Sequence, residues 1–173
     1  ARELDPFSPL GAVNPARAYY YARQSANAIE VLRREQESGT NEVKIRYMLG
    51  LALLQEQKYD EARLIFEEIY KQNKLFGSAA LGFCYAKMGE TRRARAIISD
   101  LQQDAQERTV PSLEIGMIYA GLNEKTEACF YLERAYAERH SALISFRVEP
   151  LYDGVRETPQ CANLLAQMQL NGS

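Results

Sequence analysis

Three glycine–alanine pairs with one spacing set the strongest limit on how this chain can fold. In each pair the alanine follows the glycine by twelve residues, and successive pairs begin 32 and then 34 residues apart. The pairs are Gly50 with Ala62, Gly82 with Ala94, and Gly116 with Ala128. A period of this length is typical of units built from two helices and a turn, which stack into an array. The sequence therefore predicts a repeat protein, a kind of protein that serves in binding more often than in catalysis.

Apolar and small residues recur at helical spacing inside each unit. Four residues share one helix face because they fall at i, i+3, i+4 and i+7: Arg46, Leu49, Gly50 and Leu53. A second apolar stripe, from Tyr59 to Ile69, follows a short turn, and the next two units repeat this pair of helices. Gly89 and Asn123 come just after helices, and both residue types tolerate a left-handed backbone. The turn chemistry therefore agrees with the period.

This set of residues resembles the tetratricopeptide repeat family. The pattern of that family has Leu-Gly and Tyr on the first helix, followed by alanines and a large apolar residue on the second. Some positions depart from it. Arg46, Ser78 and Ser112 stand where the family has a large aromatic residue, and Lys74, Gln106 and His140 stand where it has proline. The resemblance implies an all-α, right-handed solenoid of helical hairpins.

We expect a single domain over residues 1–173, in which the repeat units are followed by a capping segment. The expected divisions are a divergent unit at 9–42, three clear units at 43–74, 75–108 and 109–142, and a C-terminal cap at 143–173. In the divergent unit Pro15 lacks an amide hydrogen. The first helix is therefore expected to begin there with Asn14 as its cap, or to be kinked.

The last thirty residues leave the repeat pattern. Pro159 is expected to open a final helix, which carries a row of apolar residues at helical spacing: Cys161, Leu164, Leu165 and Met168. This helix is expected to cap the array, because an open end would leave apolar surface in water.

The order of elements from Ile118 to Leu170 resembles the carboxy-terminal tetratricopeptide tails of multidomain bacterial signalling and transcription-regulatory proteins. Those tails accompany winged-helix regulators, nucleotide cyclases or protein kinases, often with a membrane span between the two parts. The resemblance implies a regulatory or scaffolding tail of a larger bacterial protein. It implies a cytoplasmic location, or a periplasmic one if the parent protein has a membrane span.

Composition argues against nucleic-acid and membrane partners. The 21 basic and 23 acidic residues leave a formal net charge of -2, so no global excess attracts the chain to nucleic acid or anionic lipid. The apolar runs are too short to span a membrane. The spacings between Cys84, Cys129 and Cys161 are 45 and 32 residues, which suit neither a zinc site nor a disulfide scaffold. We therefore expect buried thiols, no metal and no cofactor, and a reducing compartment fits slightly better.

Residues that could carry catalysis lack the neighbours that catalysis needs. His140 is the only histidine, and no nucleophile or metal ligand lies near it in the sequence. The acidic pairs Glu35–Glu37 and Glu67–Glu68 lie among basic residues, a pattern typical of a solvated helix face. The basic cluster between Arg92 and Arg95 could contact an acidic partner, although an ordinary exposed face is the simpler interpretation. We expect a protein that is not an enzyme.

Function is expected on the first helix of each unit, because these helices line the concave side of such a stack. The residues expected to form a partner-binding groove are Arg17, Tyr20, Tyr21, Tyr47, Leu51, Leu54, Phe83, Leu113 and Met117. Aromatic side chains provide large contact area at low entropy cost, so the expected ligand is an apolar or amphipathic peptide or helix segment. Chaperone adaptors of this family hold a terminal carboxylate at positions that are Tyr47, Leu51, Phe76 and Ala80 here, which argues against that ligand.

Two other interpretations stay open. The groove could be filled internally, which would make the chain a structural or oligomerisation tail. A homodimer could then form through the repeat ends, with Leu10, Val13 and Tyr19 at the N-terminal end. A small ligand in the groove is a third alternative, and it would need convergent polar groups that the sequence supplies sparsely.

Overall fold

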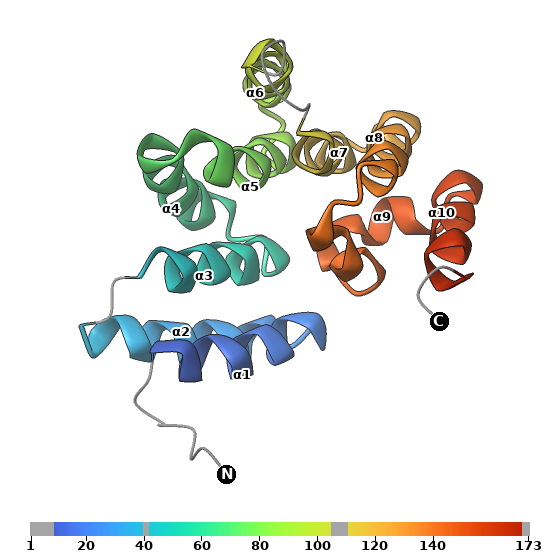
Figure 1. The fold of residues 1–173 in the computed structure, drawn as a ribbon. Helices are drawn as coiled ribbons and strands as arrows, with labels where there is room; N and C mark the ends of the chain where they lie inside the picture. The colour runs from blue at the N-terminus through green and yellow to red at the C-terminus, as the bar shows by residue number, and fades with distance from the viewer. Residues whose placement is uncertain (1–8, 40–41, 105–110, 171–173) are drawn as a thin grey trace. The chain divides into compact units, whose positions relative to one another are not determined.

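The computed structural model describes residues 9–39, 42–104 and 111–170, and all regular structure within these ranges is helical (Figure 1). The chain divides into two compact units, residues 1–74 and 75–173. Each unit is described by itself. The arrangement of paired helices confirms the predicted all-α fold of helical hairpins.

The first unit holds two helical hairpins. Its helices are α1 (Pro9–Tyr21), α2 (Ser25–Glu37), α3 (Val43–Gln55) and α4 (Tyr59–Gln72). Each helix packs against the next in chain order, and α1 also contacts α3. Large side chains with 1% exposure or less form its core: Tyr20, Leu32, Ile45, Leu53, Phe66 and Ile69. Removal of this apolar area from water is the main driving force for pairing the helices.

The second unit continues the hairpins and then changes character. Its elements are α5 (Lys74–Lys87), α6 (Thr91–Asp104), α7 (Ser112–Gly121), α8 (Lys125–Ala137), the 3₁₀ helices η2 (Ser141–Arg147) and η3 (Pro150–Tyr152), α9 (Asp153–Arg156) and α10 (Pro159–Leu170). The α7 helix packs mainly on α8, and α8 in turn contacts η2, α9 and α10. The helix predicted to begin at Pro159 is confirmed. Within the described ranges, no helix is long and apolar enough to cross a membrane.

The first helix of every hairpin ends in the same kind of turn. Arg23, Gln57, Gly89 and Asn123 have positive φ angles of 61°, 57°, 78° and 60°, and they follow one another at 34, 32 and 34 residues. At each turn two backbone N–H groups donate to carbonyls three and five residues back, at 2.8 to 3.1 Å. This double bond closes the last helical turn and needs one left-handed residue. The turns predicted at Gly89 and Asn123 are confirmed, and Arg23 carries the same period into the divergent first hairpin.

The repeated glycines allow close approach to different neighbours. A Cβ added at Gly50 would lie 2.5 Å from the Phe66 ring, which belongs to the second helix of the same hairpin. At Gly82 it would lie 2.6 Å from Ile118, which belongs to the first helix of the next hairpin. At Gly116 the nearest atom would be 3.3 Å away. One repeated position thus serves three packing arrangements, because interiors are closely packed around whichever side chain arrives there.

The start of α1 differs from the prediction. The helix begins at Pro9 and continues through Pro15, so Asn14 lies inside it and is not a cap. There the Asn14 Oδ1 accepts a hydrogen bond from Arg17 at 3.4 Å. Pro15 removes one backbone hydrogen bond from the helix. Ala16 and Tyr20 on the same helix are fully buried, and this packing favours a continuous helix in spite of the missing bond.

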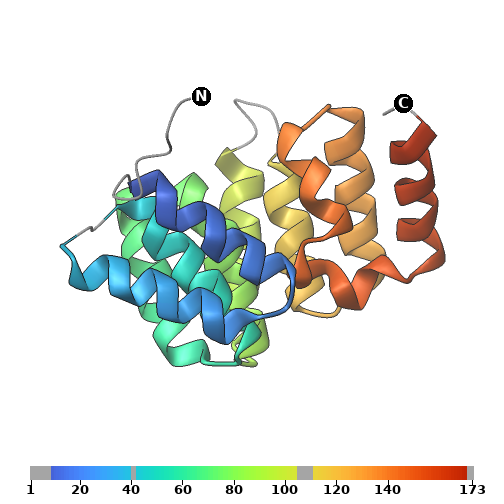
Figure 2. The ribbon, with the colours of Figure 1, turned by 90° about the horizontal axis from the view of Figure 1, so that it is seen from below.

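The expectation of three buried thiols is wrong for two of the cysteines. Cys129 of α8 and Cys161 of α10 form a disulfide, with their Cα atoms 5.4 Å apart. Cys84 is buried and takes part in no disulfide. The two bonded cysteines are 32 residues apart, which is one repeat period. Because α10 packs along α8 (Figure 2), that period places them face to face.

Candidate partner-binding surfaces

Six of the nine residues predicted for the groove belong to the first unit, on α1 and α3: Arg17, Tyr20, Tyr21, Tyr47, Leu51 and Leu54. Tyr20 is fully buried, and Leu51 and Leu54 are only 6% and 4% exposed. Arg17 is exposed, whereas Tyr21 and Tyr47 are half-buried. In this unit a partner could therefore contact Arg17 and the two half-buried tyrosines.

Contacts inside the first unit hold these tyrosines in place. The rings of Tyr20 and Tyr21 lie 5.3 Å apart, centroid to centroid. Tyr47 meets the Phe66 ring edge-on at 5.7 Å, so part of Tyr47 belongs to the core of the α3–α4 hairpin. The Gln55 amide donates to the Tyr20 carbonyl oxygen at 3.2 Å. This bond ties the end of α1 to the end of α3.

The remaining three predicted groove residues belong to the second unit. Phe83 of α5 is 4% exposed, and a Cβ added at Gly121 would lie 2.9 Å from its ring. Leu113 and Met117 of α7 are half-buried. The units are described separately, so a continuous groove that joins both sets of residues stays a prediction.

Most of the other charged residues considered for function are exposed or paired. His140 is exposed. In the basic cluster, Arg93 pairs with Glu90 at 2.9 Å and Arg95 with Glu124 at 2.5 Å. These pairs satisfy two of the three arginines that could have contacted an acidic partner. Surface pairs of this kind each contribute little to stability.

Tyr119 of α7 carries the one resolved pKa shift in the described part of the chain. Its ring stacks on Tyr131 of α8, with centroids 5.6 Å apart and planes 17° from parallel. Burial, and then the nearby Tyr131 and Glu124, raise the pKa of the Tyr119 phenol above its usual 10.0. The phenol therefore stays protonated at neutral pH and acts as a packing group with a polar edge.

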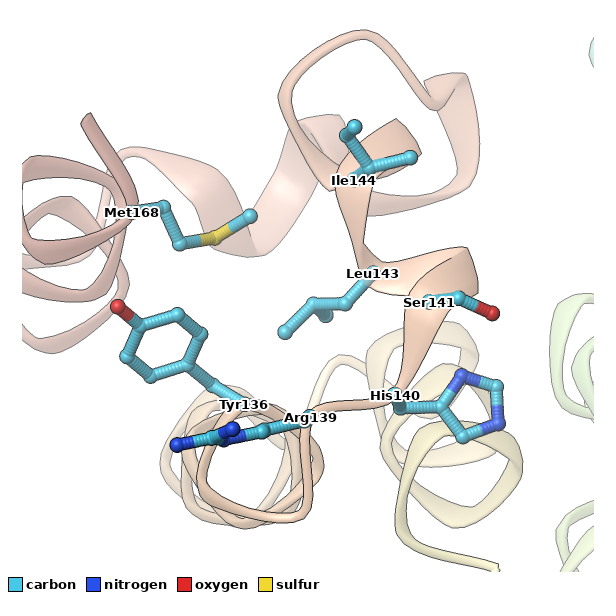
Figure 3. A pocket seen from close by; sticks show the side chains of 7 residues that line it. All are labelled: Tyr136, Arg139, His140, Ser141, Leu143, Ile144 and Met168. Atoms are coloured by element: carbon cyan, nitrogen blue, oxygen red, sulfur yellow. The ribbon is translucent and has the colours of Figure 1, made fainter. Parts of the chain in front are cut away.

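The sequence did not predict an apolar pocket between the end of α8, η2 and α10. It has a volume of about 250 Å³ and is lined by Tyr136, Arg139, His140, Ser141, Leu143, Ile144 and Met168; we call it the anchor pocket. Figure 3 shows the side chains of Tyr136, Leu143 and Met168 facing one another, with the Arg139 guanidinium beside the tyrosine ring. The His140 ring points away from these three side chains.

Three ties between α8 and α10 shape the anchor pocket. The Cys129–Cys161 disulfide joins the two helices covalently. The Gln160 amide donates to Glu133 at 2.9 Å, and the Tyr136 hydroxyl donates to the Gln167 carbonyl oxygen at 3.3 Å. Leu143 closes the floor and is only 2% exposed. The pocket is thus held by contacts along the whole length of the two helices. The only sequence signal for it is the separation of the cysteines by one repeat period.

The 32- to 34-residue period, the paired helices and their shared turns define a helical-hairpin repeat protein, a class that presents extended surfaces to other proteins. Within this class, the family model for the tetratricopeptide repeat matches residues 43–74 and 113–138. These segments contain the α3–α4 hairpin and most of the α7–α8 hairpin, so the predicted tetratricopeptide repeats are confirmed there. A search of curated proteins and a search of solved structures gave no significant match.

Proposed function

We propose that this chain is a non-catalytic protein-interaction module, and that it is the regulatory or scaffolding tail of a larger bacterial protein. The observation that carries the proposal is the match of two hairpins to the tetratricopeptide repeat. Repeats of this family generally mediate protein–protein contacts and scaffolding. The half-buried apolar side chains on the first helices support a binding face of the predicted kind.

The proposed ligand is an apolar or amphipathic peptide or helix segment. Tyr21 and Tyr47 of the first unit and Leu113 and Met117 of the second are half-buried on first helices. Partly exposed aromatic and methionine side chains are enriched at protein interfaces, because they provide contact area with few rotatable bonds or with adaptable shape. Arg17 is exposed on α1 and could pair with an acidic residue of the ligand.

Selection from a displayed peptide library on the immobilised chain, followed by fluorescence anisotropy on a selected peptide, tests this face. Met117→Glu and Tyr21→Glu should each weaken binding at least about tenfold, because the new carboxylate would lose its hydration at the contact. Leu64→Glu is the matched control, since Leu64 is 56% exposed on α4, a second helix. If the selected peptides bind all three variants with equal affinity, this face is not the binding site.

The burial of four predicted groove residues favours a second candidate, a structural or oligomerisation tail whose groove is filled internally. Those residues are Tyr20, Leu51, Leu54 and Phe83. Under this candidate the first helices act mainly as packing surfaces. At the N-terminal end proposed for a homodimer, Tyr19 is 36% exposed and Val13 is half-buried, while the Leu10 side chain lies outside the described residues.

The double variant Tyr21→Ala with Met117→Ala separates the two candidates. As an interaction module the chain should lose peptide binding and change its unfolding free energy by less than about 1 kcal/mol for each half-buried site. As a filled tail it should lose several kcal/mol, as core truncations do, or change its sedimentation behaviour if the sites lie in a dimer contact. Urea unfolding and analytical ultracentrifugation measure these outcomes.

The disulfide supports an oxidising compartment, because such bonds persist where thiols are not kept reduced. Of the two locations expected from the sequence, we therefore propose the periplasmic one for a bacterial parent protein. Alkylation of thiols in intact cells, followed by peptide mapping without reductant, should recover a linked peptide that contains Cys129 and Cys161. Recovery of both cysteines in alkylated form would place the chain in a reducing compartment.

A further inference from the structure

We propose that the anchor pocket is a second docking site, which takes one apolar side chain from an acidic segment of a partner protein. It shares no residue with the proposed face on the first helices, so either site can fail alone. Three features of the pocket carry the proposal: its size and walls, its unpaired cations, and the neighbouring carboxylates that already have partners.

The size of the pocket suits one side chain. Its volume of about 250 Å³ is below the roughly 300–1,000 Å³ of most small-molecule sites. The walls are apolar, with buried Leu143 as the floor and half-buried Tyr136 and Met168 at the sides. Ile144 beside the opening is 80% exposed, so apolar surface continues outward from the pocket. An anchor residue that fills such a pocket can dominate the energy of an interface.

The ties between α8 and α10 reduce the cost of binding. The disulfide and the Tyr136–Gln167 hydrogen bond hold both ends of the two helices together. The walls of the pocket therefore do not have to be ordered when a ligand arrives. Preorganisation of this kind favours affinity, because less conformational entropy is lost on association.

The charges at the rim indicate the chemistry of the partner. The side chains of Arg139 and His140 make no hydrogen bond or ion pair with any residue that the structure describes, and the same holds for Arg147 at the end of η2. The neighbouring carboxylates are occupied: Glu133 accepts from Gln160, and Glu138 pairs with Arg134 at 2.9 Å. The local charge without a partner is thus positive, although the whole chain has a net charge of -2.

An acidic segment with one apolar residue matches both features. Its apolar side chain would enter the pocket, and a flanking Asp or Glu would pair with Arg139, whose planar guanidinium can donate two parallel hydrogen bonds to a carboxylate. The residues that follow α10 are Asn171, Gly172 and Ser173, and they offer no apolar side chain for the pocket. We therefore assign the pocket to a partner segment.

A titration with the synthetic peptide acetyl-Glu-Asp-Leu-Asp-Glu-amide, followed by amide NMR shifts of the whole chain, tests the proposal. We expect shifts confined to residues 136–144 and 165–170, with a dissociation constant at or below about 1 mM. Replacing the central leucine of the peptide by alanine should weaken binding at least about tenfold, since the anchor is lost. Replacing its acidic residues by lysine and arginine should weaken binding as strongly.

Variants of the chain identify the groups responsible. Arg139→Asn should weaken the acidic peptide about five- to tenfold, whereas Arg139→Lys should retain most of its affinity. Asparagine tolerates the left-handed backbone that Arg139 adopts, with φ of 57°, so the first variant should fold. Met168→Glu should abolish binding by placing a charge in the pocket. Val148→Ala is the matched control, because Val148 is 47% exposed beside η2 and does not line the pocket.

Two results would overturn the proposal. One is the absence of shifts at residues 136–144 in the folded chain at millimolar peptide. The other is equal binding of the acidic and basic peptides, which would contradict the role of Arg139. Met117→Glu, which tests the face on the first helices, should leave this titration unchanged, so the two proposals are distinguished.

Discussion

The α3–α4 and α7–α8 hairpins share a family model and a spacing, yet different contacts hold them together. In both, the residue that replaces the usual large aromatic bridges to a residue 26 positions later at the open end of the hairpin. Arg46 donates to Gln72 at 3.1 Å and pairs with Glu68 at 3.0 Å. Ser112 donates to Glu138 at 3.2 Å. The position of the bridge is common to both hairpins, while its chemistry is not.

The two hairpins differ most at their glycines. Gly50 faces the fully buried Phe66 ring, and an added Cβ would meet it at 2.5 Å. Gly116 faces Leu132, and an added Cβ would meet it at 3.3 Å. The smaller side chain leaves space that the aromatic ring removes. The comparison teaches that the period determines where a close contact falls, and the partner side chain determines how close it is.

The second helices also differ in what they support. Helix α8 is joined to α10 by the disulfide, whereas no disulfide involves α4 within the described residues. A covalent tie therefore secures the C-terminal cap on α8, and apolar packing alone holds α4.

Removal of the disulfide should have the largest effect on the difference between the hairpins. The bond closes a loop with a sequence separation of 32, and chain-entropy arguments give about 3–4 kcal/mol for a loop of that length. Cys161→Ala should therefore lower the unfolding free energy in urea by about that amount. The reductant-treated parent chain should behave like the variant, and Cys84→Ser should keep its sensitivity to reductant. If reductant leaves the parent midpoint unchanged, the tie does not stabilise the cap.

Alanine at the two glycines should act in opposite directions. Gly50→Ala should destabilise the chain by roughly 1–2 kcal/mol, since overpacking against Phe66 outweighs the gain in helix propensity. Gly116→Ala should be neutral or stabilising by up to about 1 kcal/mol, because alanine favours the helix and the contact is looser. Thermal and urea unfolding of both variants measure the difference. Equal losses in the two would show that the glycines are equally constrained.

Truncation of Arg46 should cost about 1 kcal/mol. The Arg46 side chain is 12% exposed and covers the open end of its hairpin, while its partner Glu68 is 64% exposed, so loss of packing should exceed loss of the ion pair. Arg46→Leu should recover most of the stability lost in Arg46→Ala. It also removes a buried Nε that has no hydrogen-bond partner among the described residues. A leucine variant as unstable as the alanine variant would show that the charge matters more than the packing.

Alkaline pH should reveal the smallest effect, at Tyr119 of the α7–α8 hairpin. A raised pKa means that the folded state holds the phenol proton more tightly than the unfolded state does. The resulting stabilisation is complete below the unfolded pKa of 10.0 and is lost as the pH rises through the folded pKa. Tyr119→Phe should therefore lose less stability between about pH 9 and about pH 11 than the parent chain does. Urea midpoints at both pH values check this, and parallel pH curves for the two chains would contradict it.

The turns illustrate how far residue type alone can predict local structure. Gly89 and Asn123 were predictable as left-handed caps, because both residue types adopt that backbone at low cost. Arg23, Gln57 and Arg139 adopt it as well, and their residue types give no such signal. At Arg23 and Gln57 only the 34-residue spacing to the next cap marks the turn.

The predicted groove shows the same limit for the binding site. Helical spacing placed its nine residues on first helices, and the described helices carry them. It did not distinguish fully buried Tyr20 from half-buried Tyr21. Burial depends on which other side chains cover a residue, and a one-dimensional pattern holds that information only in part.

The sequence by itself determined the period, the pairing of helices and most of their turns, because these features depend on residues within a single unit of about 32–34 positions. The tertiary structure alone decided which side chain each glycine meets, that Cys129 joins Cys161, and that the end of α8 meets η2 and α10 to form an open apolar pocket. These outcomes require contacts between separate elements of the chain, and the volumes of the side chains that meet there decide them.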